Sequence, residues 1–355
     1  MSDRMDSQFF NGKKILLTGH TGFKGTWMCH VLKQMGAEVT GYALQPPTTP
    51  ALFELSGIEK DICSIEGDVR DLNGLAQVFA RVQPEIVVHM AAQPIVRESY
   101  KNPVYTYDVN VMGTVNVLEC VRKSESVRSF LNVTTDKVYK NKEWIWGYRE
   151  NEELNGYDPY SNSKSCSELV TDSYRNSFFA DGRVAISTAR AGNVIGGGDF
   201  ARDRILPDCL RAIESGADIV LRNPGSVRPY QHVLEPVFAY LMIAAGQYED
   251  IRCAGSYNVG PDENSCVTTE ELVNTFCTEW NCLTGRELKW TKECGGGPHE
   301  AGFLRLDCSR LKNTFGWKPR WDYKEAVQRT VEWMQAYTAG QDIVGVMMRQ
   351  IEAYL

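Results

Sequence analysis

Short apolar runs alternate along the chain with longer stretches in which apolar residues recur every three or four positions. The short runs predict buried strands and the longer stretches predict amphipathic helices. The expected strands cover residues 14–18, 38–42, 62–66, 86–89, 129–134, 184–190 and 256–259, and the expected helices about 23–35, 72–81, 102–123, 159–179 and 233–246. This alternation predicts an α/β fold, a doubly wound parallel sheet of the Rossmann type.

The pattern loosens after Gly192, where turns and arginines become frequent. A chain of 355 residues is expected to form two lobes. We expect a dinucleotide-binding domain at residues 1–195 plus 233–262, and a smaller mixed α/β substrate lobe at 196–232 plus 263–355. In the smaller lobe we expect helices from about 268 and 309, a glycine-rich loop at 295–297, a strand near Leu304, and a last helix at about 342–354 that packs on the body or on another subunit.

A glycine-rich turn directly follows the first expected strand and leads into the first helix. Such a unit suits a dinucleotide, because glycines allow a tight turn and let the backbone approach the pyrophosphate at the positive helix start. The second strand ends without the Asp or Glu that commonly binds the adenosine ribose, so the residues leave NAD and NADP open, with Lys24 and His20 as candidate phosphate contacts. The turn comprises Gly19, His20, Thr21, Gly22, Phe23, Lys24 and Gly25.

Tyr160 and Lys164 lie four residues apart, just after Pro159, which suits the first turn of a helix. This spacing places both side chains on one helical face. A fixed positive neighbour favours the phenolate of a tyrosine, whose ordinary pKa is about 10, so the pair is typical of an activated base. Taken alone, the pair also fits an exposed aromatic beside a solvated lysine, which is the commoner arrangement for so short a motif.

Composition and charge narrow the class of protein by exclusion. A net charge of −7, with 43% hydrophobic and 23% charged residues, argues against a general binder of nucleic acid or anionic membranes. The 11 cysteines include no Cys-x-x-Cys pair, so no metal site is expected. The N-terminus has no apolar signal core, and the longest apolar run, 237–245, is too short for a bilayer. We expect a cytoplasmic protein with reduced thiols.

Several longer motifs carry a resemblance to a known family. Residues 19–25 read GHTGFKG, 132–139 read NVTTDKVY, 144–150 read WIWGYRE, and 158–164 read DPYSNSK. This set resembles the extended short-chain dehydrogenases/reductases that act on nucleotide sugars, in particular the nucleotide-sugar 4,6-dehydratases, from about residue 13 to 318. The resemblance implies NAD as cofactor and CDP-glucose or another nucleotide hexose as substrate.

The resemblance also implies an internal hydride transfer. Carbon 4 of the sugar passes a hydride to the nicotinamide, water is lost across carbons 5 and 6, and the hydride returns to carbon 6. Three side chains are needed: a base for the 4-hydroxyl, a base for carbon 5, and an acid for the departing 6-hydroxyl. Tyr160 fits the first role, with Lys164 lowering its pKa and holding the nicotinamide ribose, and Thr135 supplies a hydroxyl to the same oxygen. Asp136 fits the acid, and Lys137, where dTDP-glucose dehydratases have Glu, is the candidate carbon-5 base.

Strand geometry sets a condition on these roles. Successive strand side chains point to opposite faces, so Asp136 and Lys137 both face the sugar only if the strand ends near Thr135. Otherwise they are a surface Asp–Lys step.

Further contacts are implied by the resemblance alone. The cofactor contacts beyond the glycine turn are expected at Asp68 (the adenine), Val69, Ala91, Ala92, Asn110 and Thr134, with Tyr160 and Lys164. The substrate contacts are expected at Gln93, Arg190, Asn193, Arg204, Arg228 and His299, where Arg228 matches a diphosphate clamp. Each of the substrate residues also fits a surface charge or a satisfied polar group. Helices 102–123 and 159–179 form a dimer seam in relatives, which implies a homodimer or homotetramer.

Three functions compete at this point. A 4,6-dehydratase uses every residue of the Thr135–Lys137 triplet together with Tyr160 and Lys164. A 4-epimerase or 4-keto reductase of the same fold leaves Asp136 and Lys137 without a role. A non-catalytic NAD(P)-sensing protein has no need to keep Tyr160 and Lys164 together. We favour them in that order.

Overall fold

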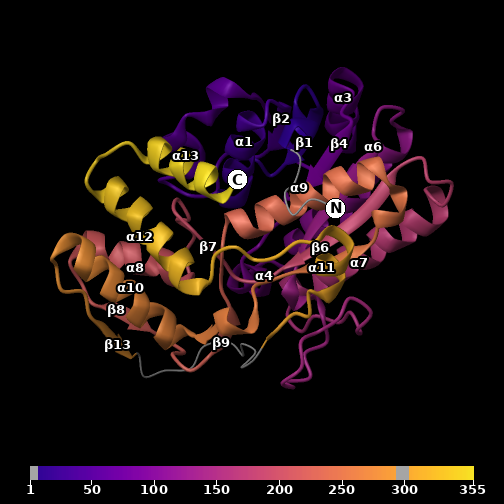
Figure 1. The fold of residues 1–355 in the computed structure, drawn as a ribbon. Helices are drawn as coiled ribbons and strands as arrows, with labels where there is room; N and C mark the ends of the chain where they lie inside the picture. The colour runs from indigo at the N-terminus through magenta and orange to yellow at the C-terminus, as the bar shows by residue number, and fades with distance from the viewer. Residues whose placement is uncertain (1–6, 293–303) are drawn as a thin grey trace.

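The computed structural model describes residues 7–292 and 304–355 and centres on a seven-stranded sheet (Figure 1). All its neighbouring strands run parallel, in the order β11-β6-β5-β4-β1-β2-β3. The strands are β1 (Lys14–Thr18), β2 (Glu38–Ala43), β3 (Cys63–Glu66), β4 (Ile86–His89), β5 (Ser129–Thr135), β6 (Ala185–Ala191) and β11 (Ser256–Val259). The predicted doubly wound parallel sheet is confirmed.

Helices cover both faces of this sheet, because alternate strand residues point to opposite sides. Leu16 of β1 joins the core cluster on one face, whereas its neighbours Ile15 and Leu17 join the cluster on the other. The first face is covered by α3 (Leu72–Val82), α6 (Gly113–Lys123) and α7 (Pro159–Phe178), and the second by α1 (Phe23–Gln34) and α9 (Leu234–Glu249). The apolar runs of the strands are thus buried on both sides, except in the edge strand β3, whose residues are half-buried or exposed.

The strand order reverses between β1 and β4, which places a crevice outside their carboxyl ends. Thr18 at the end of β1 pairs in register with His89 at the end of β4. The next strand along, β5, ends at Thr135 and pairs with β6 through Ala191. The carboxyl ends of these strands therefore meet at one edge of the sheet.

Smaller pieces of sheet and further helices lie beyond this edge (Figure 1). Two-stranded pairs join β7 (Val194–Ile195) to β10 (Gln231–His232), β9 (Val227–Pro229) to β12 (Cys266–Thr268), and β8 (Ile219–Leu221) to β13 (Trp290–Lys292). The helices here are α8 (Ile205–Ser215), α10 (Thr269–Thr284) and α12 (Tyr323–Thr338), and α13 (Ile343–Tyr354) packs on α12. Helix α11 (Ser309–Phe315) packs instead against β11 of the main sheet and against α9. The short α2 (Leu52–Ser56), α4 (Val96–Lys101) and α5 (Pro103–Tyr107) flank that sheet. The exact domain boundaries stay a prediction.

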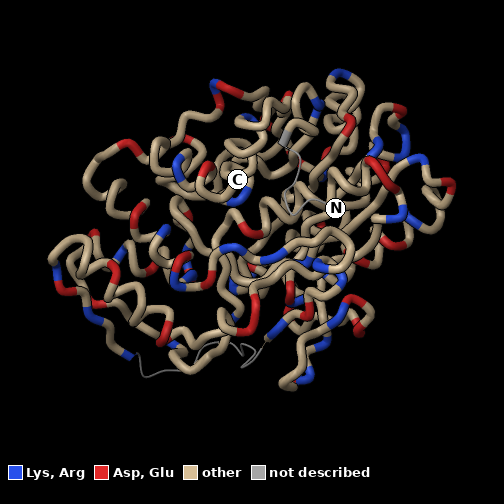
Figure 2. The backbone as a smooth tube through the Cα atoms, in the orientation of Figure 1, with Lys and Arg blue, Asp and Glu red and all other residues tan. Residues whose placement is uncertain are grey.

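Neither charge nor apolarity marks out a membrane-crossing segment in the described part of the chain. Acidic and basic residues are interspersed along the backbone (Figure 2). Within residues 7–292 and 304–355, no helix combines the length and apolarity that crossing a bilayer requires.

Several elements differ from the expectations. The predicted helix 102–123 is interrupted by a π-helical turn, Asp108–Met112, between α5 and α6. The expected strand near Leu304 is only an isolated bridge between Tyr148 and Leu306, because the segment meets a partner at a single residue pair. Helices α8 and α12 were not predicted. The last helix packs on the body, where the Tyr354 hydroxyl donates to Glu235 Oε2 at 2.7 Å. The expected loop 295–297 and His299 lie outside the described residues.

Candidate active site at the carboxyl edge of the sheet

Two glycines of the turn after β1, Gly19 and Gly25, lie so close to other main-chain atoms that a side chain is excluded there. Gly19 has φ +78°, and a Cβ there would lie 2.7 Å from Ala91 N. A Cβ at Gly25 would lie 2.2 Å from Gly19 O. The turn brings backbone to the start of the twelve-residue helix α1, whose free N–H groups attract anions. The close-packed cradle and its main-chain donors fit the pyrophosphate of a dinucleotide.

Two side chains of this turn point elsewhere than expected. His20 is fully buried, and its Nε2 lies 2.8 Å from Ser64 Oγ with the ring against Gly41 of β2. Burial lowers the pKa of His20 to about 4, so the ring is neutral. The His20 imidazole is therefore not the expected phosphate contact, because the missing side chain of Gly41 makes the pocket that receives the ring. A cofactor contact through the His20 main chain stays a prediction. The Thr21 hydroxyl donates to Leu44 O at 2.9 Å.

Lys24 extends toward the reactive residues. Its Nζ lies 5.9 Å from the centre of the Tyr240 ring on α9. Burial and the neighbouring Arg204 lower the pKa of Lys24 to about 8, and Asp136 and Asp199 oppose this. A phosphate contact for Lys24 stays a prediction, as does a contact through Phe23.

Of the cofactor contacts expected beyond the glycine turn, Asp68 lies at the rim of the site and Asn110 is buried beneath it. Asp68 accepts from the Arg70 guanidinium at 2.6 Å and from the Arg70 N–H at 2.9 Å, and is 23% exposed, so it lies at the rim. Asn110 sits in the π-helical turn, where it accepts from Gln93 N at 2.8 Å and donates to Ser163 Oγ at 2.9 Å. It is a support for the Gln93 segment. Contacts from Asp68, Val69, Ala91 and Ala92 remain predictions.

Gln93 is the first substrate residue that the structure contradicts. Its side chain is 7% exposed, its Nε2 donates to Thr106 Oγ1 at 2.9 Å, and its Oε1 accepts from Ile95 N at 2.6 Å. Both ends of the amide thus have partners inside the protein, and the main-chain N–H and C=O of Gln93 are both hydrogen-bonded to the Asn110 side chain.

Tyr160 and Lys164 lie on the first turns of α7, as predicted. Pro159 is the first residue of the helix, and Asp158 caps it by accepting from Ser161 N at 3.0 Å. Both reactive side chains are buried, with exposures of 9% and 4%. The Lys164 Nζ donates to Val133 O on β5 at 3.0 Å.

The pKa values of Tyr160 and Lys164 are shifted away from the values of the free side chains. Burial raises the pKa of Tyr160 to about 12, although a hydrogen bond with Thr135 opposes the rise. Burial and the ammonium of Lys24 lower the pKa of Lys164 to about 7. In the chain by itself, loss of solvent therefore outweighs the neighbouring charges at both groups. That Lys164 lowers the pKa of Tyr160 stays a prediction.

The Thr135–Lys137 triplet meets the condition set by strand geometry. Strand β5 ends at Thr135, and a 3₁₀ turn, Asp136–Val138, follows at once. The Thr135 hydroxyl donates to Asp136 Oδ1 at 3.0 Å and accepts from Lys137 N at 3.4 Å. Because Asp136 and Lys137 lie in this turn and not in the strand, their side chains are not forced to opposite faces of the sheet.

Asp136 has the environment of a proton donor. It is 1% exposed, and its Oδ2 has no hydrogen-bond partner within the described residues. Burial raises the pKa of Asp136, while Lys137, Thr135 and Arg228 oppose the rise. A carboxyl group that holds its proton at higher pH can deliver that proton to a leaving oxygen.

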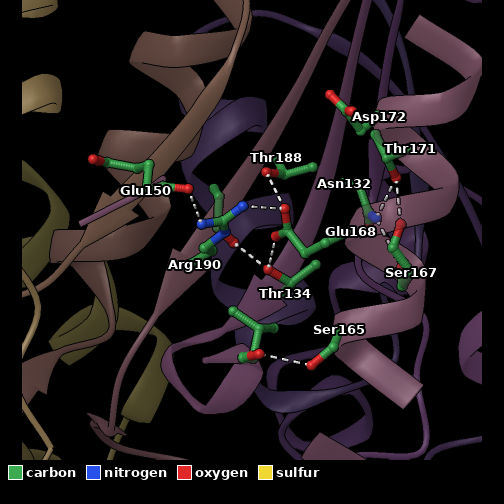
Figure 3. A network of polar contacts seen from close by, with 12 residues as sticks. Asn132, Thr134, Glu150, Ser165, Ser167, Glu168, Thr171, Asp172, Thr188 and Arg190 are labelled. Carbon is green, nitrogen blue, oxygen red and sulfur yellow. Dashed lines mark hydrogen bonds and ion pairs between the residues drawn. The ribbon is translucent and has the colours of Figure 1, made fainter. Parts of the chain in front are cut away.

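Arg190 and Thr134 contact the core (Figure 3). The Arg190 Nη2 lies 2.8 Å from Glu168 Oε2, with the two side chains 3% and 1% exposed. The Thr134 hydroxyl donates to the other oxygen of Glu168. The prediction that Arg190 binds substrate is therefore wrong, because its charge is neutralised by a buried carboxylate on α7. The Thr134 hydroxyl is likewise occupied by Glu168, and a cofactor contact by another atom of Thr134 stays a prediction.

The remaining substrate residues lie around the same edge. Arg228 on β9 is buried near Asp136, and its Nη1 donates to Val227 O at 2.9 Å. Arg204, 37% exposed, pairs with Asp199 at 2.9 Å and is an electrostatic neighbour of Tyr160. Asn193 accepts through its main chain from Gln231 N at 3.1 Å. Substrate contacts by Arg228, Arg204 and Asn193 stay predictions.

Other residues at the site were not found from the sequence. Thr18, His89 and Thr114 form a buried chain of contacts of 2.8 and 3.2 Å that links β1, β4 and α6. Glu168 could have been noticed, since it follows Lys164 by four residues and so lies one helical turn farther along. Asp199 and Tyr240 stand in no sequence motif that would have placed them at the site.

Sequence comparison places this geometry in a known family. The family model described as GDP-mannose 4,6 dehydratase matches residues 16–330. The chain is 46% identical to the CDP-glucose 4,6-dehydratase of Salmonella typhimurium, over 99% of this chain and 98% of that protein. It is 24% identical to dTDP-glucose 4,6-dehydratase 1 of Escherichia coli, over 93% of this chain and 95% of the other.

Solved structures share the fold. The dTDP-glucose 4,6-dehydratase of Bacillus anthracis, in complex with NAD, matches with a TM-score of 0.76 at 21% identity, covering 94% of this chain and 100% of the other. The UDP-glucose 4-epimerase of Thermotoga maritima, with UDP-glucose, matches with a TM-score of 0.78 at 20% identity, covering 91% and 99%. With its glycine cradle, its Tyr160–Lys164 pair and the family model spanning most of its length, the chain belongs to the GDP-mannose 4,6 dehydratase family.

Proposed function

We propose that this chain is an NAD-dependent lyase that converts CDP-D-glucose to CDP-4-keto-6-deoxy-D-glucose. The 46% identity to a CDP-glucose 4,6-dehydratase over 99% of the chain supports both the reaction and the nucleotide. The glycine cradle supports a dinucleotide, and the NAD complexes among the structural neighbours favour NAD.

One observation carries the dehydratase assignment over an epimerase. The buried Asp136 carboxyl, with its raised pKa, lies directly beside Thr135, which is hydrogen-bonded with Tyr160. An epimerase needs only the base at the 4-hydroxyl. A dehydratase also needs an acid for the leaving hydroxyl, and burial, which raises the pKa of Asp136, supports Asp136 in that role.

The side chains divide the proton transfers among them. When bound, NAD supplies an acceptor that holds a hydride and gives it back. Tyr160 removes the proton of the 4-hydroxyl, and Thr135 holds the same oxygen. Lys137, at the start of the 3₁₀ turn, removes the proton of carbon 5. Asp136 gives its proton to the 6-oxygen as water leaves.

The residues around this edge of the sheet also support proposals for substrate binding, oligomeric state and location. Arg228, with Arg204 and Asn193, is proposed to hold the diphosphate and the sugar. A homodimer is proposed through the helices after β4 and along α7, where large apolar side chains are exposed. These are Val104, Met112, Leu169 and Phe178, with exposures of 80%, 49%, 55% and 48%. A cytoplasmic location is proposed from the free thiols of the ten described cysteines.

Incubation with CDP-glucose and NAD tests the reaction. A 4-keto-6-deoxy product without net reduction of the cofactor supports the proposal. A galactose-configured product would assign an epimerase, and no turnover would leave only a binding protein. Parallel assays with dTDP-, UDP- and GDP-glucose identify the nucleotide.

Lys137→Ala tests the carbon-5 base. We expect the variant to oxidise carbon 4, seen as absorbance of the reduced cofactor at about 340 nm, and to lose dehydration by a factor of about 10²–10⁴. Lys140→Ala is the matched control, since Lys140 lies three residues farther on, is 52% exposed and pairs with Glu153. Normal product formation by Lys137→Ala would remove Lys137 from the mechanism.

A further inference from the structure

A single buried carboxylate, Glu168, joins the helix of the reactive pair to the two strands beneath it (Figure 3). One of its oxygens accepts from the Thr134 hydroxyl on β5. The other accepts from the Thr188 hydroxyl at 2.7 Å and from Arg190 Nη2 at 2.8 Å, both on β6. Glu168 therefore makes charge-assisted contacts with two strands from one position on α7.

The partners of Glu168 extend to the reactive turn. Thr134 directly precedes Thr135, so its hydrogen bond acts one residue away from the triplet. Arg190 donates through Nη1 to the Tyr139 hydroxyl at 2.8 Å and to Glu150 O at 2.9 Å. Tyr139 directly follows the 3₁₀ turn that carries Asp136 and Lys137. The network thus reaches the segments on both sides of the triplet.

We propose that Glu168 is a positioning residue, which with Arg190 holds α7 in register with the ends of β5 and β6 and so sets the distance between Tyr160 and Thr135. The proposal rests on the proposed function only in naming Tyr160 and Thr135 as reactive. Glu168 lies four residues after Lys164, so a shift of its carboxylate moves the helical turn that bears the reactive lysine.

The negative charge of Glu168 acts on the pKa of Lys164, which a contact by packing alone would not change. Burial and the ammonium of Lys24 lower the pKa of Lys164, and the Glu168 carboxylate opposes this. Among the described residues, His89 on β4 also interacts with Lys164, whose ammonium lowers the pKa of that histidine. On the far side of Glu168, its carboxylate pairs with Arg190 on β6. Beside α7, Tyr107 donates to Asn162 and Asp108 pairs with Arg70. If the Glu168 charge is removed, nothing offsets the effect of the Lys24 ammonium, and the pKa of Lys164 should fall further.

Glu168→Gln tests this, because it keeps the length of the side chain and an acceptor oxygen. A double variant, Glu168→Gln with Arg190→Met, removes both charges and leaves no unpaired buried cation. Thr171→Val is the matched control: Thr171 lies one turn beyond Glu168 on the same helix and accepts from Asn132 on β5 at 2.9 Å, without charge. The control removes a buried contact between the same two elements.

Titration of the Lys164 Cε chemical shift in the full chain, labelled with carbon-13 at lysine Cε, is the first readout. The signal is assigned by its loss in Lys164→Met. We expect the midpoint to fall by about 1 pH unit in Glu168→Gln, by less in the double variant, and not at all in Thr171→Val. This measurement needs no turnover, so it stands even if CDP-glucose is not the substrate.

Steady-state kinetics with CDP-glucose are the second readout. We expect kcat of Glu168→Gln to fall about 10–100-fold with KM within about twofold, because a misplaced base slows chemistry more than binding. An unchanged Lys164 midpoint, or equal effects of Glu168→Gln and Thr171→Val, would overturn the proposal. Loss of the fold in both Glu168 variants would also overturn it, and would make the ion pair purely structural.

Discussion

Gly25→Ala adds one methyl group where the turn after β1 enters α1. The new Cβ would lie 2.2 Å from Gly19 O and 2.7 Å from His20 Cα, whereas ordinary van der Waals contact begins at 3.4 Å. Both are main-chain atoms, so neither can swing aside as the end of a flexible side chain does. The turn itself must move.

The expected cost follows from two opposing effects. Overpacking of this kind costs about 1–3 kcal/mol, and rigid backbone partners place this site near the upper value. Alanine regains up to about 1 kcal/mol of helix propensity. We therefore expect the free energy of unfolding to fall by about 2 kcal/mol. Displaced N–H groups at the helix start should also weaken NAD binding at least about tenfold.

Gly22→Ala is the matched control within the same turn. Its Cβ would lie 3.5 Å from Gly19 O, an ordinary contact, and Gly22 has φ −79°, which alanine adopts readily. Its unfolding free energy should change by less than about 0.5 kcal/mol. Urea unfolding followed by tryptophan fluorescence measures stability, since Trp27 on α1 is fully buried, and calorimetric titration with NAD measures affinity. If Gly25→Ala matches Gly22→Ala in stability, the proposed packing of the turn is refuted.

Two further predictions concern proton transfer and stability. Tyr160→Phe should keep the fold and NAD binding, whereas oxidation of carbon 4 should slow about 10²–10⁴-fold. Single-turnover absorbance of the reduced cofactor measures this rate. A rate near that of the parent would exclude Tyr160 as the base. Burial raises the pKa of Glu235 from 4.5 to about 7, so the folded protein binds more protons than the unfolded chain between these values, and stability falls as pH rises through that window. The loss should total about 3 kcal/mol in urea unfolding, and Glu235→Gln should flatten it; an equal slope in both proteins would contradict the assignment.

The arrangement of elements and the reactive pair could be predicted from the sequence, because both depend on contacts that are local in the chain. Apolar runs specify buried parallel strands, and glycines at positions 19 and 25 specify a turn that no side chain fits. Pro159 and Asp158 begin α7, and the four-residue spacing then puts Tyr160 and Lys164 on one face. Each of these follows from backbone geometry within a few residues.

Only the tertiary structure decided which polar side chains face the site. Arg190 pairs with Glu168, Gln93 with Thr106, and His20 with Ser64, partners that lie 22, 13 and 44 residues away in the chain. Buried polar groups must find hydrogen-bond partners, and those partners are set by packing between distant segments. The same burial raised the pKa of Tyr160 against the expectation from its neighbour Lys164. Spacing along a chain gives the direction of a side chain, whereas its solvation and its partner arise only when the chain is folded.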